Sequence, residues 1–344
     1  MSNRMIEPGR VSHRQGGPRK NVRFAGAQIP VTFDVAENVK TIKEAIDWAA
    51  ENNVDYLLTP EAALSGYYPT FMETQEQYQT LQQGEQEVVS HAKDNGIGLC
   101  LGTLFLNNEE HGSIKRNQVR FYNKSGDFVG AYNKVMTIAV DNVVPGEMLN
   151  ANQGSTAESE WTGHPITELG SDSDTSFEVS TLICNDMYGE NKKGESLARS
   201  VLFQLRNNWT PIDLILHPTY GLRGTEVIEE FDLEQNDTTQ ERKDNIRKSM
   251  EDWHRTHLEM MSYQLNTTFL VVDTCSDFGG IESKFNTSSP SGVVKNGEWL
   301  VQAPRKGKQY FYHDFNLPGR STRLHDSHFE TLEELSKRNP EPKA

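Results

Sequence analysis

In the first sixty residues, segments with the apolar pattern of a buried strand alternate with a segment that has the apolar spacing of a helix. The mostly apolar segment VRFAGAQI at 22–29 is typical of a buried strand. Residues 35–49 then carry apolar side chains at the 3.6-residue spacing of a helix, with Asp34 at the N-cap position and Glu37 three residues later. A second apolar run at 54–58 indicates another strand. Strand, helix and strand within about 35 residues predict a βαβ unit with parallel strands.

The same alternation continues along the chain. A polar helix is predicted around 73–95 and a central strand at 96–104. Strand-like segments at 117–123 and 127–134 flank Lys124-Ser125-Gly126, which predicts a hairpin because glycine readily adopts turn conformations. The second half predicts strands at 177–183, 212–216 and 268–272, with helices near 194–207 and 246–265. This order predicts an α/β layered domain with a mixed sheet or sheets.

Three segments fit no regular element. Residues 1–21 are Gly/Pro-rich and are expected to form a flexible arm. Residues 221–245 are highly charged, and such a long connection is expected to be a lid, a contact loop or disordered. Residues 320–344 form a charged tail, for which we expect a solvated or oligomer-contacting extension.

Composition narrows the class of protein. The 344 residues include 34 Lys+Arg and 49 Asp+Glu, giving a formal net charge of −15. Such an acidic chain is not expected to bind nucleic acid or an anionic membrane surface, because both require clustered cations. No apolar run approaches the roughly 20 residues of a membrane span, and the basic N-terminus has no apolar signal core. We therefore expect a cytoplasmic protein.

Three cysteines, odd in number and far apart, cannot form a closed disulfide framework and fit a reducing compartment. Cys100 and Cys275 lie in or beside apolar strands, where a thiol behaves as an inert hydrophobe. Cys184 ends an apolar run and precedes a polar turn that leads to a helix. Backbone N–H groups in such a turn can face a developing oxyanion. On position alone, a structural and a catalytic Cys184 are equally well supported.

Two other predicted strands end in ionisable residues. Glu61 directly follows the second apolar run, and Lys134 closes the hairpin. Open α/β sheets place their sites at the carboxyl ends of strands. On position alone, however, a surface acid and a solvated strand terminus would be the favoured interpretations.

Taken together, these residues lie in sequence blocks that resemble the nitrilase superfamily of carbon–nitrogen hydrolases. The blocks occur in the family's order and cover roughly residues 22–300. They are VRFAGAQIPVTFDVAENV, LLTPEAALSGYYP with the glutamate, GAYNKVM with the lysine, STLICNDMYGE with the cysteine, IDLILHPTYG and NTTFLVVDTCSDFGG. Three ordered blocks that each contain a catalytic residue type are far more specific than one short motif.

The resemblance implies a four-layer αββα sandwich in a single domain over residues 22–319. It also implies a Glu–Lys–Cys triad with Cys184 as nucleophile, Glu61 as general base and acid, and Lys134 as the cation that stabilises the tetrahedral intermediate. The chemistry agrees, since a thiol of ordinary pKa near 8.5 needs a base at neutral pH. The backbone N–H of Asn185 would share the oxyanion with Lys134. No metal or organic cofactor is required, and a homo-oligomer, dimer or higher, is expected.

Many family members use a second glutamate after the lysine. Glu147 is the candidate here, although it lies farther along than is usual, and Asp141 is a competitor. A solvated loop acid is an equally good interpretation of Glu147.

The residues around the cysteine and the glutamate favour different substrate classes. Typical nitrilases carry Trp-Glu after the cysteine, whereas Cys184-Asn185-Asp186 keeps the Asp of amidases and carbamoylases. The block around Glu61, in contrast, is like that of nitrilases. We expect hydrolysis of a small linear amide or N-carbamoyl compound, with nitrile hydrolysis as the alternative. A catalytically silent binding or scaffold protein on the same fold is the alternative from another class.

Aromatic and histidine residues near the strand ends complete the predicted site. Tyr67, Tyr68, Thr219 and Tyr220 are plausible pocket walls, and His217 ends a predicted strand where it could approach the substrate or support the site.

A metal site is not predicted. His254 and His257 could share one helix face, but the surrounding apolar residues indicate an ordinary packing helix.

Overall fold

A computed structural model describes the fold of this chain. The residues described are 20–67, 74–109, 112–136, 167–169, 177–188, 214–221, 240–276 and 287–317. Within them the strands form two six-stranded sheets. The first has the order β12 (Gln309–Leu317), β1 (Lys20–Gln28), β2 (Tyr56–Leu58), β3 (Gly98–Glu109), β4 (Gly112–Tyr122) and β5 (Phe128–Asn133). The second has the order β11 (Glu298–Gln302), β10 (Gly292–Lys295), β9 (Thr268–Asp273), β8 (Leu214–Thr219), β7 (Phe177–Thr181) and β6 (Thr167–Leu169).

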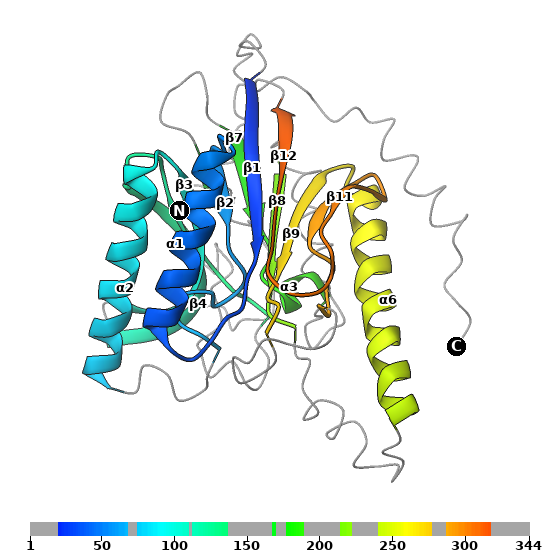
Figure 1. The fold of residues 1–344 in the computed structure, drawn as a ribbon, viewed down its shortest axis with the longest axis horizontal. Coiled ribbons are helices and arrows are strands. Elements are labelled where there is room, and N and C mark those ends of the chain that lie inside the picture. Colours follow the sequence, from blue (N-terminus) through cyan, green and yellow to red (C-terminus); the bar gives the residue numbers. More distant parts are fainter. Residues whose placement is uncertain are drawn as a thin grey trace, which may run out of the picture.

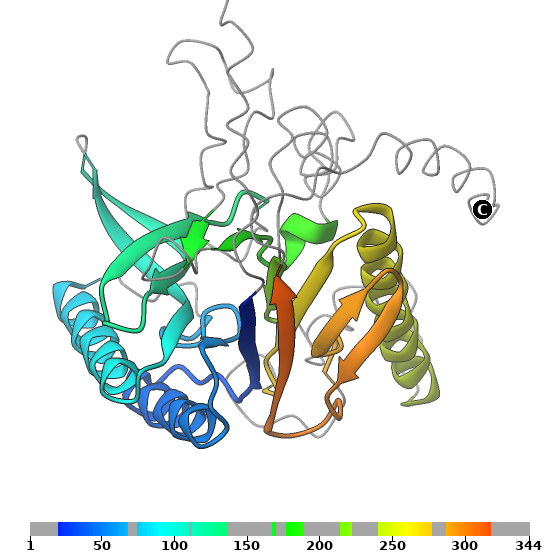
Figure 2. The ribbon, with the colours of Figure 1, turned by 90° about the horizontal axis from the view of Figure 1, so that it is seen from above.

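The two sheets face each other, and helices cover their outer faces. Figure 2 shows α1 (Val35–Glu51) and α2 (Gln75–Asp94) outside the first sheet and α6 (Gln240–Gln264) outside the second. An apolar core fills the space between the sheets with side chains from both, including Phe24, Leu58, Phe121, Leu216, Leu270 and Val272. The αββα sandwich expected from the sequence is confirmed.

The first predicted βαβ unit is present. The Asp34 side chain caps α1 by accepting hydrogen bonds from the N–H groups of Ala36 at 2.8 Å and Glu37 at 3.4 Å. The apolar stripe of α1 is buried against the sheet. Strands β1 and β2 pair in parallel, with Phe24 opposite Tyr56. A short-range sequence pattern therefore sets the frame of the first sheet.

The predicted hairpin is also confirmed, and a further one precedes it. Gly126 turns the chain between β4 and β5 with φ +78°, and its N–H donates to the Asn123 carbonyl at 2.9 Å. Strand β4 begins at Gly112, earlier than expected, because it pairs along the whole length of β3. This pairing carries the chain from the end of β3 back toward the site.

Several elements were not predicted. Strands β6, β10, β11 and β12 are additional, and Asn296-Gly297 joins β10 to β11 with both φ angles positive, at 52° and 82°. Helix α6 begins at Gln240, so the end of the charged 221–245 segment is helical. Its first residues, Gln-Glu-Arg-Lys, are good helix formers despite their polarity.

Other expectations lie outside the described residues. These are the helix near 194–207, nearly all of the 1–21 arm, residues 222–239 of the charged segment and the 320–344 tail. The domain bounds 22–319 stay a prediction. None of the described helices has the length and apolar character needed to cross a bilayer.

Polar side chains join the two sheets at the carboxyl ends of β1 and β9. Thr274 Oγ1 donates to the Ile29 carbonyl and Ser276 Oγ to the Val31 carbonyl, each at 3.0 Å. The Val31 N–H returns a bond to Ser276 Oγ at 2.9 Å. All four residues are buried, so these bonds are shielded from water. The carboxyl ends of the two sheets are thereby held at the same edge of the sandwich.

We expect Gly26→Ala to destabilise the sandwich. Gly26 lies in β1 where a Cβ would come within 2.3 Å of Phe311 in β12 and 2.7 Å of Val272 in β9 of the other sheet. Overpacking of this kind costs about 1–3 kcal/mol. Gly130→Ala in β5 is the matched control, because a Cβ there meets nothing within 4 Å. Urea denaturation should give a lower free energy of unfolding for Gly26→Ala alone. Equal stability of the two variants would contradict the close approach of the sheets.

Candidate functional site

The loop after β2 presents Glu61 at the carboxyl end of the first sheet. The Thr59 N–H donates to the Cys100 carbonyl at 3.1 Å, and the Gly102 N–H donates to Thr59 Oγ1 at 2.9 Å. A Cβ at Gly102 would lie 1.9 Å from the Pro60 carbonyl oxygen, so only glycine lets this loop cross β3 so closely. Glu61 is 1% exposed. The chemistry of a buried carboxylate then depends on its partners.

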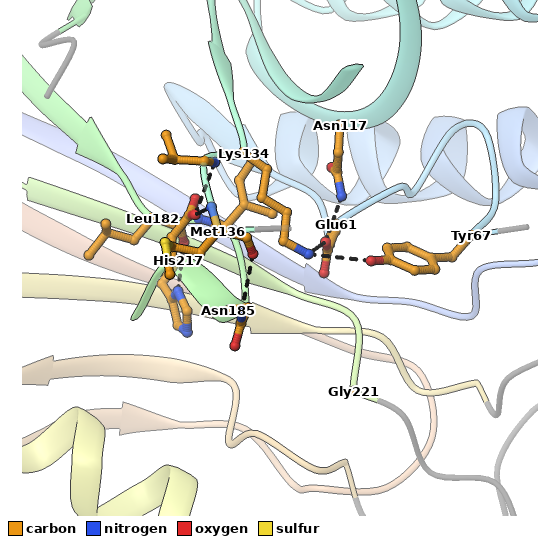
Figure 3. Close-up of polar contacts among 12 residues, drawn as sticks. Glu61, Tyr67, Asn117, Lys134, Met136, Leu182, Asn185, His217 and Gly221 are labelled. Atoms are coloured by element: carbon orange, nitrogen blue, oxygen red, sulfur yellow. Dashed lines mark hydrogen bonds and ion pairs between the residues drawn. The ribbon is translucent and has the colours of Figure 1, made fainter. Parts of the chain in front are cut away.

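The two oxygens of Glu61 have different surroundings. Oε1 accepts hydrogen bonds from Lys134 Nζ at 2.8 Å and from Asn117 Nδ2 at 2.7 Å. Oε2 is also buried, but it accepts no hydrogen bond from the described residues. Figure 3 shows Asn117 and Lys134 both directed at this carboxylate. One oxygen is therefore anchored, and the other remains available to a proton.

Lys134 directly follows β5, and its side chain is fully buried against that of Glu61. Burial lowers the pKa of the Lys134 ammonium, but the charges of Glu61 and Cys184 outweigh burial and raise that pKa above its ordinary value. Lys134 Nζ also donates to Tyr67 Oη at 3.3 Å. The Tyr67 ring stacks on Tyr220 with a centroid separation of 4.9 Å. A permanently charged ammonium thus stands beside an aromatic wall built from both sheets.

Cys184 lies in the turn between β7 and the short helix α3 (Asn185–Tyr188). It is half-buried, and its φ of +45° is unusual for a residue other than glycine. Its N–H donates to the Pro218 carbonyl at 2.9 Å. The Asn185 N–H, by contrast, donates to no acceptor in the described part of the chain, and the Asn185 side chain is held by the Met136 carbonyl at 3.2 Å (Figure 3). The strained turn therefore presents a thiol and a backbone donor together.

Asp186 is a site residue that the sequence interpretation did not assign. Its Oδ1 accepts from the N–H groups of Val135 at 3.1 Å and Met136 at 2.6 Å. Its Oδ2 accepts from the Ile183 N–H at 3.0 Å and from Tyr132 Oη at 2.8 Å. One buried carboxylate thus joins the chain that carries the lysine to the turn that carries the cysteine.

The ionisation of Asp186 is shifted as well. Burial raises the pKa of Asp186 to about 6, against the opposing effect of its hydrogen bonds and of the Lys134 charge. Its position in the cysteine block, two residues after Cys184, was the available signal.

Asn117 is the second residue that sequence reasoning missed. It shares the inner face of β4 with Val119 and Phe121, which belong to the core between the sheets. The alternate positions Ser113, Lys115, Val119 and Phe121 are both polar and apolar, so the local pattern carries no clear signal for Asn117. Asn117 is 1% exposed and contacts Glu61.

His217 contacts both sides of the turn that carries the cysteine. Its Nδ1 lies 2.6 Å from the Leu182 carbonyl and its Nε2 lies 3.1 Å from Tyr188 Oη. Because a carbonyl only accepts, Nδ1 carries the proton and Nε2 accepts from the tyrosine. Burial lowers the pKa of His217 to about 4, so the ring is neutral near pH 7. The structure thus engages both ring nitrogens with the protein, and an approach of His217 to the substrate stays a prediction.

The remaining candidates divide into described and undescribed residues. Thr219 is buried, and its hydroxyl donates to the Val272 carbonyl at 3.5 Å. Tyr68, Asp141 and Glu147 lie outside the described residues, so the assignment of a second active-site acid stays a prediction.

The histidines of α6 bind backbone carbonyls. His254 Nδ1 lies 2.8 Å from the Ser288 carbonyl and His257 Nε2 lies 3.2 Å from the Met187 carbonyl. Across the ranges that the structure describes, no group of three or more His, Cys, Asp or Glu side chains is arranged to hold a metal ion. These histidines join α6 to the loops of the second sheet.

The chemical capacity of the site follows from these contacts. A buried carboxylate oxygen can take up and return a proton. A buried ammonium and a backbone N–H can stabilise negative charge that develops beside the thiol. The described residues thus include the groups that a nucleophilic site requires.

Comparison with known proteins agrees with this arrangement. A family model described as carbon–nitrogen hydrolase matches residues 21–193, just over half of the chain. A cysteine-to-alanine mutant of an amidase of the nitrilase superfamily from Nesterenkonia AN1 has a TM-score of 0.59 at 19% identity, covering 94% of this chain and 98% of that chain. A search of curated proteins finds no match.

Two further structures of the Nesterenkonia sp. AN1 amidase have a TM-score of 0.58 at 19% identity, with the same coverage of 94% and 98%. One shows covalent addition of the acetamide moiety of fluoroacetamide at that protein's active-site cysteine. The other is a complex with butyramide. At this level of identity, the likeness shows a common fold.

We expect His217 to make stability depend on pH. Its pKa is about 4 when folded against an ordinary value of 6.5, so between these pH values the unfolded chain binds a proton that the folded chain does not. The free energy of unfolding of the wild type, relative to His217→Asn, should therefore rise with pH across this window by on the order of 3 kcal/mol. Urea denaturation of both proteins from pH 4 to 7 measures the difference.

The contribution of Asp186, whose raised pKa acts in the opposite direction, is common to both proteins and cancels. The charges of Asp273, His254 and His257 act on His217 itself, so their effect is part of the measured difference. A difference in stability that stays constant with pH would show that His217 is not held neutral.

Proposed function

Because this chain belongs to the carbon–nitrogen hydrolase family, we propose that it hydrolyses a small linear amide or an N-carbamoyl compound through a thioester on Cys184. The observation that carries the proposal is the buried Glu61–Lys134 pair, whose ammonium interacts electrostatically with Cys184. A buried ion pair is costly to desolvate and contributes little net stability, which favours a chemical role for it.

Acylation begins with a proton transfer. Glu61 takes the thiol proton of Cys184, and the sulfur forms a bond to the carbonyl carbon of the substrate. The carbonyl oxygen becomes an oxyanion, which the Lys134 ammonium and the Asn185 N–H stabilise. Glu61 then gives its proton to the leaving nitrogen, the carbon–nitrogen bond breaks, and ammonia departs. The acyl group remains on the sulfur as a thioester.

Deacylation repeats these steps with water. Glu61 takes a proton from water as the water oxygen attacks the thioester carbonyl, and the same donors stabilise the second oxyanion. The carbon–sulfur bond then breaks and the proton returns to Cys184. A linear amide yields a carboxylic acid. An N-carbamoyl compound yields a carbamic acid, which decomposes to carbon dioxide and an amine.

Small aliphatic amides are the substrates to test first. The amidase of similar fold binds butyramide and reacts with fluoroacetamide at its cysteine. The residues after the nucleophile, Asn185 and Asp186, differ from the Trp-Glu of typical nitrilases. Nitrile hydrolysis is retained as an alternative because the block around Glu61 resembles that of nitrilases. We further propose that the protein is cytoplasmic, because none of its three cysteines forms a disulfide. The family resemblance favours a homo-oligomer.

Cys184→Ala should abolish turnover. The test is an ammonia-release screen over linear amides, N-carbamoyl amines, N-carbamoyl amino acids and nitriles. Cys100→Ala, which removes a fully buried thiol of raised pKa, is the control and should stay active. Ammonia release that survives in Cys184→Ala would refute the thioester mechanism. A wild type that releases no ammonia and is not alkylated by iodoacetamide at Cys184 would favour the silent scaffold.

Lys134→Ala should reduce kcat/KM by on the order of 10²-fold or more, since it removes an oxyanion donor. Lys124→Ala is the matched control, because Lys124 is 41% exposed and pairs with Asp55 away from the site. Steady-state kinetics on the best substrate of the screen measure both variants. Equal activity of the two variants would show that Lys134 does not stabilise the oxyanion.

A further inference from the structure

We propose that Asn117 is a positioning residue that assigns the base function to one oxygen of Glu61, Oε2. The inference rests on the proposed role of Glu61 as base and acid. It adds a residue that binds neither substrate nor nucleophile and acts through the glutamate.

The hydrogen bonds of the carboxylate carry the argument. Asn117 Nδ2 at 2.7 Å and Lys134 Nζ at 2.8 Å both donate to Oε1. Oε2 is buried and accepts from none of the described residues. An oxygen with two strong donors is a poor place for an incoming proton, whereas an oxygen with none is a good one. The thiol proton is therefore received at Oε2.

Lys134 alone would not fix this choice. The two oxygens of a carboxylate are chemically equivalent, and a flexible ammonium can follow either of them. Asn117 is different because its amide projects from a sheet strand, and a carboxylate only accepts, so the NH₂ group must face Glu61. The asparagine thus fixes the orientation of the carboxylate plane.

The position of Asn117 serves both members of the ion pair. Its side chain binds Glu61, and its backbone carbonyl accepts the Lys134 N–H at 2.8 Å. A substitution changes the first contact and keeps the second, because the backbone remains. The effect of Asn117 on Glu61 can therefore be tested without detaching β5 from β4.

Stability does not explain this asparagine. Its Oδ1 is buried and accepts no hydrogen bond from the described residues, and a buried polar atom without a partner lowers stability. The neighbouring inner positions of β4 are Val119 and Phe121. An apolar residue would suit the packing better, so we assign the amide to its contact with Glu61.

The experiment compares Asn117→Leu with Gln118→Leu. Gln118 is the adjacent amide on β4, is equally buried, and donates to Asn133 Oδ1 at 2.7 Å rather than to Glu61. For Asn117→Leu we expect kcat to fall about 10- to 100-fold with little change in KM, because general acid and base catalysis is impaired. The acid limb of its kcat/KM profile should move up by about one pH unit, since the ionised carboxylate loses a donor. Gln118→Leu should keep the wild-type profile.

The outcomes are separable. A wild-type pH profile in Asn117→Leu would overturn this inference while leaving the hydrolase proposal in place. Shifted profiles in both variants would reduce Asn117 to a structural role and overturn it too. A wild type inactive on every substrate would instead refute the proposed function. Should Asn117→Leu not fold, Asn117→Ala is measured in the same way, and the pH dependence of Cys184 alkylation by iodoacetamide provides a readout independent of turnover.

Discussion

The site depends on one interaction, the fully buried contact between Glu61 and Lys134 at 2.8 Å. Neither charge could be removed from water alone without a large desolvation cost, so each requires the other. The contact spans two loops of the first sheet that lie 73 residues apart in sequence. Pairing of β2 with β3 and of β3 and β5 with β4 brings these loops together. The sheet therefore holds the two charges close enough for their attraction to offset the cost of desolvation.

The second sheet contributes Cys184, the proposed nucleophile, so the proposed site needs both sheets in register. The bonds of Thr274 and Ser276 to the first sheet fix the common edge, and the Asp186 carboxylate fixes the distance between the lysine strand and the cysteine turn. These are hydrogen bonds rather than apolar contacts. Packing alone brings the layers together, whereas directional bonds define how one sheet is placed on the other.

Sequence patterns predicted the parts of this structure that depend on neighbouring residues. The cap at Asp34 is local. The triad candidates Glu61, Lys134 and Cys184 were identified by the sequence blocks that resemble the nitrilase superfamily, because position alone did not favour them. The partners Asn117 and Asp186 were missed because their contacts with Glu61 and Met136 span 56 and 50 residues, which no local pattern encodes.

The β10–β11 hairpin is a different case, since Asn296-Gly297 is a strong local turn signal that was overlooked. The pairing of β12 with β1 had no such signal. Its first contact, Lys20 with Leu317, joins residues from opposite ends of the described chain (Figure 1). A pairing of such high contact order closes a very long loop and is slow to form. During synthesis, one edge of β1 therefore stays unpaired until β12 has left the ribosome. In this interval the open edge exposes the chain to aggregation.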